Sequence, residues 1–265
     1  MTKPAGSFIW YELMTTDPVG AAAFYEPVVG WKIVGQPEPD VPVDYRHIVR
    51  ADGGHNGGVL VLTEAMLAGG ARPGWLGYLH VADLDAALPA IEADGGKVLM
   101  PKMTIPEGSF ALVTDPQGVP VYVMTSVPPP GKPDAASDAY DYKTPQHVSW
   151  NELYAPDLDA AKAFYARHFN FEFNSSLPMG PMGDYCFIDH GGETIGAMMQ
   201  KPEQVPVGMW NHYIRVADID VATATVKELG GQVFNGPMEV PGGDWVINGM
   251  DPQGAPFSLV GARKG

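Results

Sequence analysis

The sequence predicts an α+β protein that is built from four copies of one βαβββ module. The chain is a tandem duplication, because residues 8–33 reappear as residues 148–173 in gapless register. A weaker repeat inside each half relates short segments that each end in an aspartate: Trp10–Asp17 with Leu76–Asp83, and Trp150–Asp157 with Asn211–Asp218. Because the modules come in pairs, we expect two closed domains instead of an open solenoid.

Each module is expected to open with a strand whose last residue caps a helix. Asp17 is followed by Pro18, a favoured residue at the first helical position, and Asp83, Asp157 and Asp218 stand at the equivalent places. Glycines mark the helix ends, and short runs of β-forming residues after each helix predict the remaining strands. The order of elements in a module is therefore βαβββ.

A Pro-rich linker is expected between the halves. Residues 128–146 include Pro128, Pro129, Pro130, Pro133 and Pro145 and show neither helical nor strand periodicity. The predicted domains are residues 1–127 and residues 147–265, with two modules in each.

One face of each sheet is expected to carry aromatic and ionisable residues. Alternate residues of a strand point to opposite faces, so Trp10 and Glu12 lie on the face away from the packed Leu13. The same alternation applies to the other modules. The predicted ligand-binding residues on this face are Trp10, Tyr78, Tyr122, Met124, Trp150, Glu152, Tyr154, Tyr213, Arg215 and Ser258.

Composition narrows the classes of partner. A formal charge of −15 and a pI near 4.7 argue against nucleic acid and anionic membranes, so a small molecule is the expected partner. Cys186 is the single cysteine, and the N-terminus lacks an apolar signal region, which together predict a reduced, cytoplasmic protein. No apolar run approaches membrane-spanning length.

Together these features resemble the vicinal oxygen chelate superfamily, which contains glyoxalase I, bleomycin-resistance proteins and extradiol dioxygenases. The resemblance rests on the βαβββ modules, the Phe-Tyr pair after the first helix cap, the Val-Ala-Asp strand ends and the Asp-Pro-Gln-Gly turn before the last strand. The Trp-x-Glu-Leu opening, the Trp-x-x-Tyr at the middle strands and the two domains in one chain are similar to a bacterial glyoxalase-like group. The resemblance covers nearly the whole chain outside the linker. It implies curved sheets with outer helices, and a cleft lined by the aromatic and ionisable face.

The resemblance also implies where a metal would bind. Metal-using members carry a His or Glu at the first position of the opening strand, seven residues before the helix-cap Asp, and a Glu near the end of the last strand. The matching residues here are poor ligands for a divalent cation: Trp10, Leu76 and Tyr122 in the first half, and Trp150, Asn211 and Ser258 in the second. We therefore predict the fold without the superfamily's metal, and no other cofactor.

Glu12 and His80 are the predicted catalytic residues. The family arrangement places the opening strands of paired modules side by side, so the two side chains would meet in the first cleft and transfer a proton. The alternative interpretation is a structural salt bridge, which is favoured for Glu152 with Arg215 because Arg cannot act as a base. The aromatic residues also have two interpretations. They form the base of a pocket for a planar or apolar ligand, or they pack into the space that the metal occupies in other members of the superfamily.

The leading hypothesis is a glyoxalase-like protein that binds a small organic molecule in its clefts, with acid–base chemistry at Glu12 and His80 if it is an enzyme. The first alternative is a metal-dependent lyase, isomerase or dioxygenase, in which a one-residue bulge turns His212 toward Glu152 and Glu193. The second alternative is a non-catalytic, resistance-type protein that sequesters its ligand. All four modules are present in one chain, so a monomer or weak homo-oligomer is expected.

Overall fold

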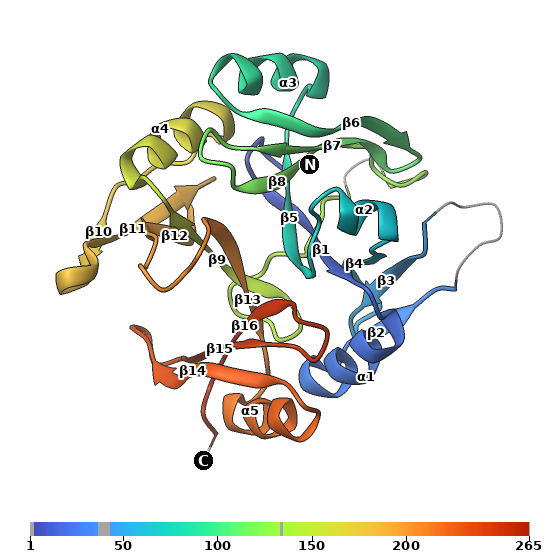
Figure 1. Cartoon of the computed structure of the whole chain (residues 1–265), viewed down its shortest axis with the longest axis vertical. Helices are drawn as coiled ribbons and strands as arrows, with labels where there is room; N and C mark the ends of the chain where they lie inside the picture. Colours follow the sequence, from blue (N-terminus) through green and yellow to red (C-terminus); the bar gives the residue numbers. More distant parts are fainter. Residues whose placement is uncertain (1–2, 37–42, 133–134, 265) are drawn as a thin grey trace. The chain divides into compact units, whose positions relative to one another are not determined.

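The structure, a computed structural model, describes residues 3–36, 43–132 and 135–264 (Figure 1). In the first half the elements are β1 (Phe8–Thr15), α1 (Pro18–Val29), β2 (Lys32–Val34), β3 (Tyr45–Val49), β4 (His55–Val61), α2 (Glu64–Ala68), β5 (Gly74–His80), α3 (Leu84–Ala93), β6 (Lys97–Ile105), β7 (Gly108–Thr114) and β8 (Pro120–Ser126). In the second half they are β9 (Val148–Ala155), α4 (Leu158–Phe169), β10 (Ser176–Pro178), the 3-10 helix η1 (Gly180–Met182), β11 (Asp184–His190), β12 (Glu193–Gln200), β13 (Met209–Arg215), α5 (Ile219–Glu228), β14 (Gln232–Glu239), β15 (Trp245–Met250) and β16 (Pro256–Gly261).

Each module has the predicted order of one strand, one helix and three strands. The helix caps are also confirmed: the Asp17 carboxylate accepts hydrogen bonds from the backbone N–H groups of Val19 and Gly20, and Gly30 ends α1 in the left-handed conformation with φ 88°. The side chains of Asp83, Asp157 and Asp218 cap α3, α4 and α5 in the same way. Local sequence therefore determines where the helices begin.

The strands form two eight-stranded sheets, one from each half of the chain. The strand order is β2-β3-β4-β1-β5-β8-β7-β6 in the first sheet and β10-β11-β12-β9-β13-β16-β15-β14 in the second. The two orders are the same topology, because each strand of the second sheet is the copy of the strand at that place in the first. The predicted fold, an α+β protein with two four-stranded modules per sheet, is confirmed.

Contacts between elements divide the chain into two compact units that do not coincide with the halves. Unit 1 contains Met1–Ile9, Leu76–Ser137 and Trp150–Asn211, and unit 2 contains Trp10–Trp75, Asp138–Ser149 and His212–Gly265. Each unit thus takes one module from each half. Within unit 2 helix α1 contacts α5, and within unit 1 helix α3 contacts α4. Each predicted domain contains the strands of one sheet. The helix contacts, in contrast, join modules that belong to different halves.

The interior of unit 2 is organised by a hydrogen-bonded chain of three side chains. The Trp75 indole N–H donates to the Tyr25 hydroxyl at 3.2 Å, and that hydroxyl donates to the Asp251 carboxylate at 3.0 Å. Burial, followed by the charge of Asp251, raises the pKa of Tyr25 well above its usual value, so the phenol remains a donor. Burial also raises the pKa of the Asp251 carboxyl.

Unit 1 repeats this arrangement with the complementary modules. The Trp210 indole N–H donates to the Tyr165 hydroxyl at 3.0 Å. The pKa of Tyr165 is raised by burial and then by the neighbouring carboxylate of Asp115. In both units the tyrosine of the Phe-Tyr motif in one half meets the aspartate of the Asp-Pro-Gln-Gly turn in the other half. We call these trios, Trp75–Tyr25–Asp251 and Trp210–Tyr165–Asp115, the core chains.

The linker lacks regular structure over its described part. Residues 128–132 and 135–146 contain neither a helix nor a longer strand, and Tyr140 forms one isolated parallel bridge with Val148. Pro133 lies outside the described residues. In the described part of the chain, no helix combines the length and the apolar character that crossing a membrane requires.

His212 lies in the interior of unit 2, whereas the metal-dependent alternative requires a one-residue bulge that turns it into the cleft. The register of β13 with β16 is continuous from Tyr213↔Ser258 to Arg215↔Val260. The His212 imidazole packs edge-on against the Tyr11 ring at 4.9 Å, and its side chain is buried. Tyr11 lies on the face of β1 opposite to Trp10 and Glu12, so this contact places His212 away from the face of the two predicted ligand residues.

This buried imidazole predicts sensitivity to acid. Burial lowers the pKa of His212 to about 3, whereas an unfolded histidine has a pKa of about 6.5. The unfolded state therefore binds more protons between these values, and stability falls as the pH drops below about 6.5. We expect His212 to account for about 2 kcal/mol of lost stability by pH 5.

The measurement is urea unfolding of the wild type and His212→Asn at pH 7 and pH 5. The variant should show the smaller decrease in the free energy of unfolding. His55→Asn is the control for removal of an exposed histidine. Equal decreases in the wild type and His212→Asn would contradict the assignment.

Candidate functional site

The predicted ligand face of the first module carries a second kind of hydrogen-bonded trio. On β1, Trp10 and Glu12 point to the same face, and the Trp10 indole N–H donates to the Tyr45 hydroxyl at 2.8 Å. The Tyr45 hydroxyl in turn is hydrogen-bonded to Glu12. Glu12 is only 2% exposed, whereas Trp10 and Tyr45 are half-buried. We call Trp10, Tyr45 and Glu12 the first face trio.

A glycine on the intervening strand makes this contact possible. Tyr45 lies on β3 and Glu12 on β1, and β4 runs between these strands. Gly58 of β4 is in register with Glu12, and a Cβ atom at Gly58 would collide with the Tyr45 hydroxyl. The phenol therefore crosses β4 over a residue without a side chain.

The second half contains the same trio. The Trp150 indole N–H donates to the Tyr185 hydroxyl at 2.7 Å, and the Tyr185 hydroxyl donates to Glu152 Oε2 at 2.6 Å. Glu152 is 5% exposed. Ala197 stands at the place of Gly58, in register with Glu152, so this trio tolerates one methyl group beneath it. Trp150, Tyr185 and Glu152 form the second face trio.

Burial and charge keep the phenol of the first face trio protonated. The pKa of Tyr45 is raised well above its usual value, first by burial and then by the charge of Glu12. A protonated phenol accepts from an indole and donates to a carboxylate at the same time. A carboxylate has about four acceptor sites, so it can take part in several hydrogen bonds at once.

The surroundings of the two face trios differ. His47 and His55 are exposed beside the first, with ring centroids 6.2 Å and 6.4 Å from that of Trp10 and 5.2 Å from each other. The corresponding residues beside the second are Phe187, whose ring lies 6.1 Å from Trp150, and Thr194. The first site is therefore more polar, whereas the second is more apolar.

The other predicted ligand residues of the first half belong to unit 1 and are largely covered. Tyr78 and Tyr122 stack with centroids 4.2 Å apart and rings 15° from parallel, and Phe110 lies 5.9 Å from Tyr78. Tyr78 is 5% and Tyr122 3% exposed. Met124 is also buried. This mutual stacking supports the interpretation that these rings fill space.

The corresponding residues of the second half, in unit 2, are joined by polar contacts. The Asn248 amide donates to the Tyr213 hydroxyl at 3.1 Å and to Ser258 Oγ at 2.9 Å. Leu112 occupies the place of Asn248 in the first half, as the register of β7 with β8 and of β15 with β16 shows.

Tyr154, on β9, is half-buried and extends the face that carries Trp150.

The two predicted catalytic residues, Glu12 and His80, lie in different compact units and have different hydrogen-bond partners. Glu12 belongs to unit 2 and is bound by Tyr45, whereas His80 belongs to unit 1. His80 Nδ1 lies 3.2 Å from the Met124 carbonyl oxygen, which can only accept, so Nδ1 carries the proton and Nε2 the lone pair. Burial lowers the pKa of His80, which favours the neutral ring. Transfer of a proton between Glu12 and His80 stays a prediction.

Arg215 has a carboxylate partner that the sequence did not indicate. Its guanidinium forms a two-point ion pair with Asp244, with distances of 2.6 Å and 3.2 Å. The Tyr142 ring lies 5.8 Å from the guanidinium. Asp244 precedes β15 and is far from Arg215 in sequence, so no spacing pattern pointed to it.

The residues at the superfamily's metal positions do not fit a divalent cation. Trp10 and Trp150 present indole N–H groups that are donors only, and Leu76 has no ligand atom. The Tyr122 ring is stacked against Tyr78, and Ser258 accepts from Asn248. No catalytic step can be derived through a metal at these positions.

The displaced ligand set of the first alternative also finds no support. His212 is buried against Tyr11, and Glu193 is exposed at the start of β12. Among the described residues, the group whose ligand atoms come together is a different one, Asp52, Asp138 and His147. Its members were not among the predicted site residues, because they lie in a turn, in the linker and before β9.

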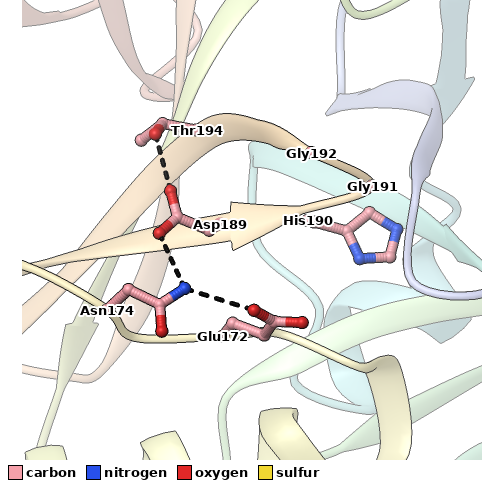
Figure 2. Close-up of a pocket in the computed structure, with 7 residues that line it drawn as sticks. All are labelled: Glu172, Asn174, Asp189, His190, Gly191, Gly192 and Thr194. Carbon is pink, nitrogen blue, oxygen red and sulfur yellow. Dashed lines mark hydrogen bonds between the residues drawn. The ribbon is translucent and has the colours of Figure 1, made fainter.

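A polar pocket lies at the turn between β11 and β12 in unit 1 (Figure 2). Asn174 Nδ2 donates to Glu172 and to Asp189 at 3.2 Å each, and the Thr194 hydroxyl donates to Asp189 at 2.6 Å. The two carboxylates are thus supplied with protein donors. Burial lowers the pKa of His190 at the end of this pocket.

A duplicated sheet of βαβββ modules with an aromatic and carboxylate face defines a glyoxalase-like protein of two repeats. The chain belongs to the Glyoxalase/Bleomycin resistance protein/Dioxygenase superfamily, whose family model matches residues 7–123 and residues 144–259. Each half therefore carries one full copy of the family's repeat, which confirms the resemblance that the motifs indicated.

Similar proteins have diverse names. CFP32 of Mycobacterium tuberculosis, described as a candidate glyoxylase, is 29% identical over 255 residues, covering 95% of this chain and 93% of that protein. The anthracycline biosynthesis protein DnrV of Streptomyces peucetius is 27% identical over 288 residues, covering 100% and 97%.

Solved structures share the fold at low identity. The Mn(II)-bound glyoxalase from Novosphingobium aromaticivorans has a TM-score of 0.65 at 19% identity, covering 97% of this chain and 82% of that one. The 2,3-dioxygenase LapB from Pseudomonas sp. KL28 has a TM-score of 0.62 at 14% identity, covering 99% and 94%.

We expect the tyrosine of each face trio to stabilise the fold. Tyr45→Phe or Tyr185→Phe removes a hydroxyl that joins a tryptophan to a buried carboxylate, and should lower the free energy of unfolding by about 1–3 kcal/mol. Urea unfolding at pH 7 measures this change. Tyr142→Phe, at a tyrosine that is 45% exposed, is the matched control. Losses no larger than the control's would show that the face trios are dispensable for stability.

Proposed function

We propose that each half binds a small organic molecule with a planar aromatic surface at its face trio, without the superfamily's metal. The observation that carries this proposal is the pair of trios, in which a half-buried indole and phenol lie over a nearly inaccessible carboxylate. An aromatic surface next to a fixed acceptor is a typical arrangement for recognising a flat molecule with a hydroxyl or amino group.

The chemistry of the ligand follows from the two parts of the site. The rings of Trp10 and Trp150 offer stacking surface, and the glutamates accept hydrogen bonds from donors on the ligand. Tyr45 and Tyr185 hold the carboxylates in place. Two relatives are named for anthracycline biosynthesis, and anthracyclines are planar, polycyclic and hydroxylated, which supports this class of ligand.

The duplication itself favours binding over turnover. Both halves keep the Trp–Tyr–Glu trio, but the position of His80 is Arg215 in the second half, where Asp244 neutralises the guanidinium. The trio, which is present in both halves, is expected to have the same role in each half, whereas His80 is present in the first half alone. We therefore propose ligand binding for both halves, and acid–base chemistry at Glu12 and His80 only for the first.

Titration with a hydroxyanthraquinone, followed by tryptophan fluorescence, tests binding. The wild type should bind two molecules per chain, and Trp10→Leu and Trp150→Leu should each remove one, because each variant deletes the stacking surface of one half. Trp245→Phe is the control, since Trp245 lies beneath Arg263, with the guanidinium 3.8 Å above its ring. Far-UV circular dichroism verifies the fold. An unchanged stoichiometry in both leucine variants would contradict the proposal.

For a ligand that is turned over, we expect His80→Ala or Glu12→Gln to lower kcat by about 10²–10⁴-fold, the usual contribution of a general acid or base. Since burial lowers the pKa of His80, kcat/KM should rise with pH and reach half its plateau below pH 6.5. The pH profile of His80→Ala should lack this limb. Near-wild-type turnover in both variants would leave a sequestering protein as the function.

A further inference from the structure

We propose that Asp52, Asp138 and His147 form a binding site for one divalent cation of the zinc type, which ties the linker to the first half of the chain. The three residues come from the turn between β3 and β4, from the linker and from the residue before β9. Their ligand atoms all lie within 4.8 Å of one another. This site is separate from the metal positions of the superfamily and from both face trios.

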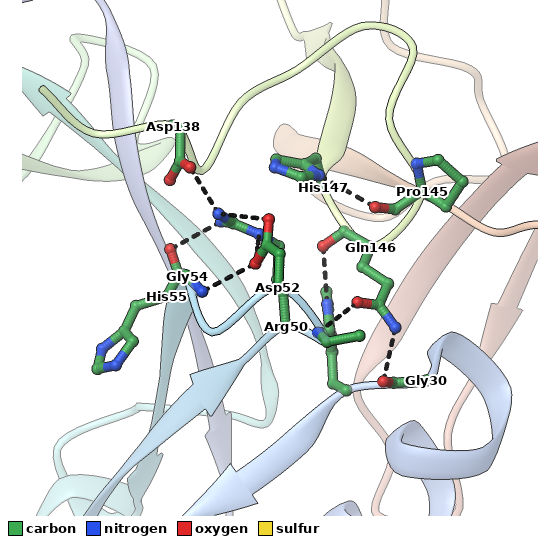
Figure 3. A network of polar contacts seen from close by, with 11 residues as sticks. Gly30, Arg50, Asp52, Gly54, His55, Asp138, Pro145, Gln146 and His147 are labelled. Atoms are coloured by element: carbon green, nitrogen blue, oxygen red, sulfur yellow. Dashed lines mark hydrogen bonds and ion pairs between the residues drawn. The ribbon is translucent and has the colours of Figure 1, made fainter.

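His147 has the protonation pattern of a metal ligand. Its side chain is 5% exposed, and Nδ1 lies 3.0 Å from the Pro145 carbonyl oxygen. A carbonyl only accepts, so the proton is on Nδ1 and the lone pair of the neutral ring is on Nε2. Histidines that bind metals commonly donate the other ring N–H to a backbone carbonyl in this way. Figure 3 shows Nε2 on the side of the ring that faces Asp138.

The groups around His147 Nε2 favour the binding of a cation. Within the described residues, Nε2 has no hydrogen-bond donor, and the groups it faces are two carboxylates, which are acceptors when ionised. A cation at this point would be attracted by both carboxylates and would also accept the lone pair of Nε2. A divalent cation satisfies all three groups at once.

Both carboxylates are held in place by an arginine. The Arg50 side chain is 1% exposed, and its guanidinium pairs with Asp138 at 2.6 Å and with Asp52 at 3.3 Å. Asp52 Oδ1 also accepts from the Gly54 N–H at 2.8 Å, which is the leading cause of its lowered pKa. Arg50 therefore holds both side chains near each other, and one guanidinium with two carboxylates leaves one net negative charge at pH 7.

The end of the linker is fixed by Gln146, the residue before His147. The Gln146 side chain accepts from the Ala51 N–H at 2.8 Å and donates to the Gly30 carbonyl at 2.6 Å, and its backbone carbonyl accepts from the Trp31 indole at 2.7 Å (Figure 3). These bonds place His147 next to the turn that carries Asp52. The carboxylates are more adaptable, because the Asp52 and Asp138 side chains are 58% and 66% exposed and can close the remaining distance.

The donor set selects the kind of cation. Imidazole nitrogen and carboxylate oxygen are both ligand types of Zn²⁺, and a site with three protein ligands leaves the fourth position to water. Mg²⁺ and Ca²⁺ prefer oxygen ligands throughout and would bind more weakly, and Mn²⁺ stands below Zn²⁺ in the usual order of affinity. Bound Zn²⁺ would join three segments and stabilise the folded chain.

The test is calorimetric titration of the full-length, EDTA-treated protein with ZnCl₂, together with thermal unfolding with and without Zn²⁺. The wild type should bind one Zn²⁺ per chain at this site and unfold at a higher temperature with the metal. Asp138→Asn and His147→Gln should each weaken binding at least about tenfold and remove the thermal shift. Asp138→Asn changes an exposed side chain, so it tests the site even if His147→Gln fails to fold.

Glu172→Gln is the matched control, because Glu172, Asp189 and His190 form the other polar pocket with a histidine and two carboxylates. This variant should bind Zn²⁺ like the wild type. The proposal is overturned if the wild type gives no binding heat, if Asp138→Asn binds with unchanged affinity, or if Glu172→Gln abolishes binding.

Discussion

The fold depends on a buried bond between a tyrosine of one half and an aspartate of the other. Tyr25 of α1 donates to Asp251, and Asp251 also accepts the backbone N–H groups of Gln253 and Ala255, which shape the Asp-Pro-Gln-Gly turn. Tyr165 and Asp115 repeat this arrangement with the halves exchanged. Because a buried carboxylate or phenol without a partner is costly, each motif requires its counterpart in the other half. This requirement explains why the compact units combine modules of different halves.

The face trios contain the same Trp–Tyr–carboxylate hydrogen bonds as the core chains, but their rings are less buried. In the core chains all three side chains are buried, so their hydrogen bonds serve the fold alone. In the face trios the carboxylate is buried but the indole and phenol remain half-exposed. The half-exposed rings are the surface on which the proposed binding rests, and each tyrosine holds the carboxylate beside them by a hydrogen bond. Gly58 in one half and Ala197 in the other leave space for the tyrosine to cross a strand, so small residues on β4 and β12 are as necessary as the trios themselves.

The two halves have diverged around this shared centre. The first has two exposed histidines beside its trio, and the second has Phe187 and Thr194 at those places. Farther along the face, the stacked Tyr78 and Tyr122 are replaced by a polar group of Tyr213, Asn248 and Ser258. The duplicated fold thus keeps its trios while their neighbours make one face more polar than the other.

The sequence by itself determined the modules, the helix caps, the eight strands per half and which residues share a face, because repeats, caps and alternation are local patterns. It also placed Trp10 and Glu12, and their equivalents Trp150 and Glu152, on one face of their strands. It did not identify Tyr45 as the partner of Glu12, Asp244 as the partner of Arg215 or the group at His147. Those contacts join side chains that are 33, 29 and up to 95 residues apart along the chain. Only the tertiary structure brings them together, since strand order and register, which no local pattern encodes, decide which distant side chains meet.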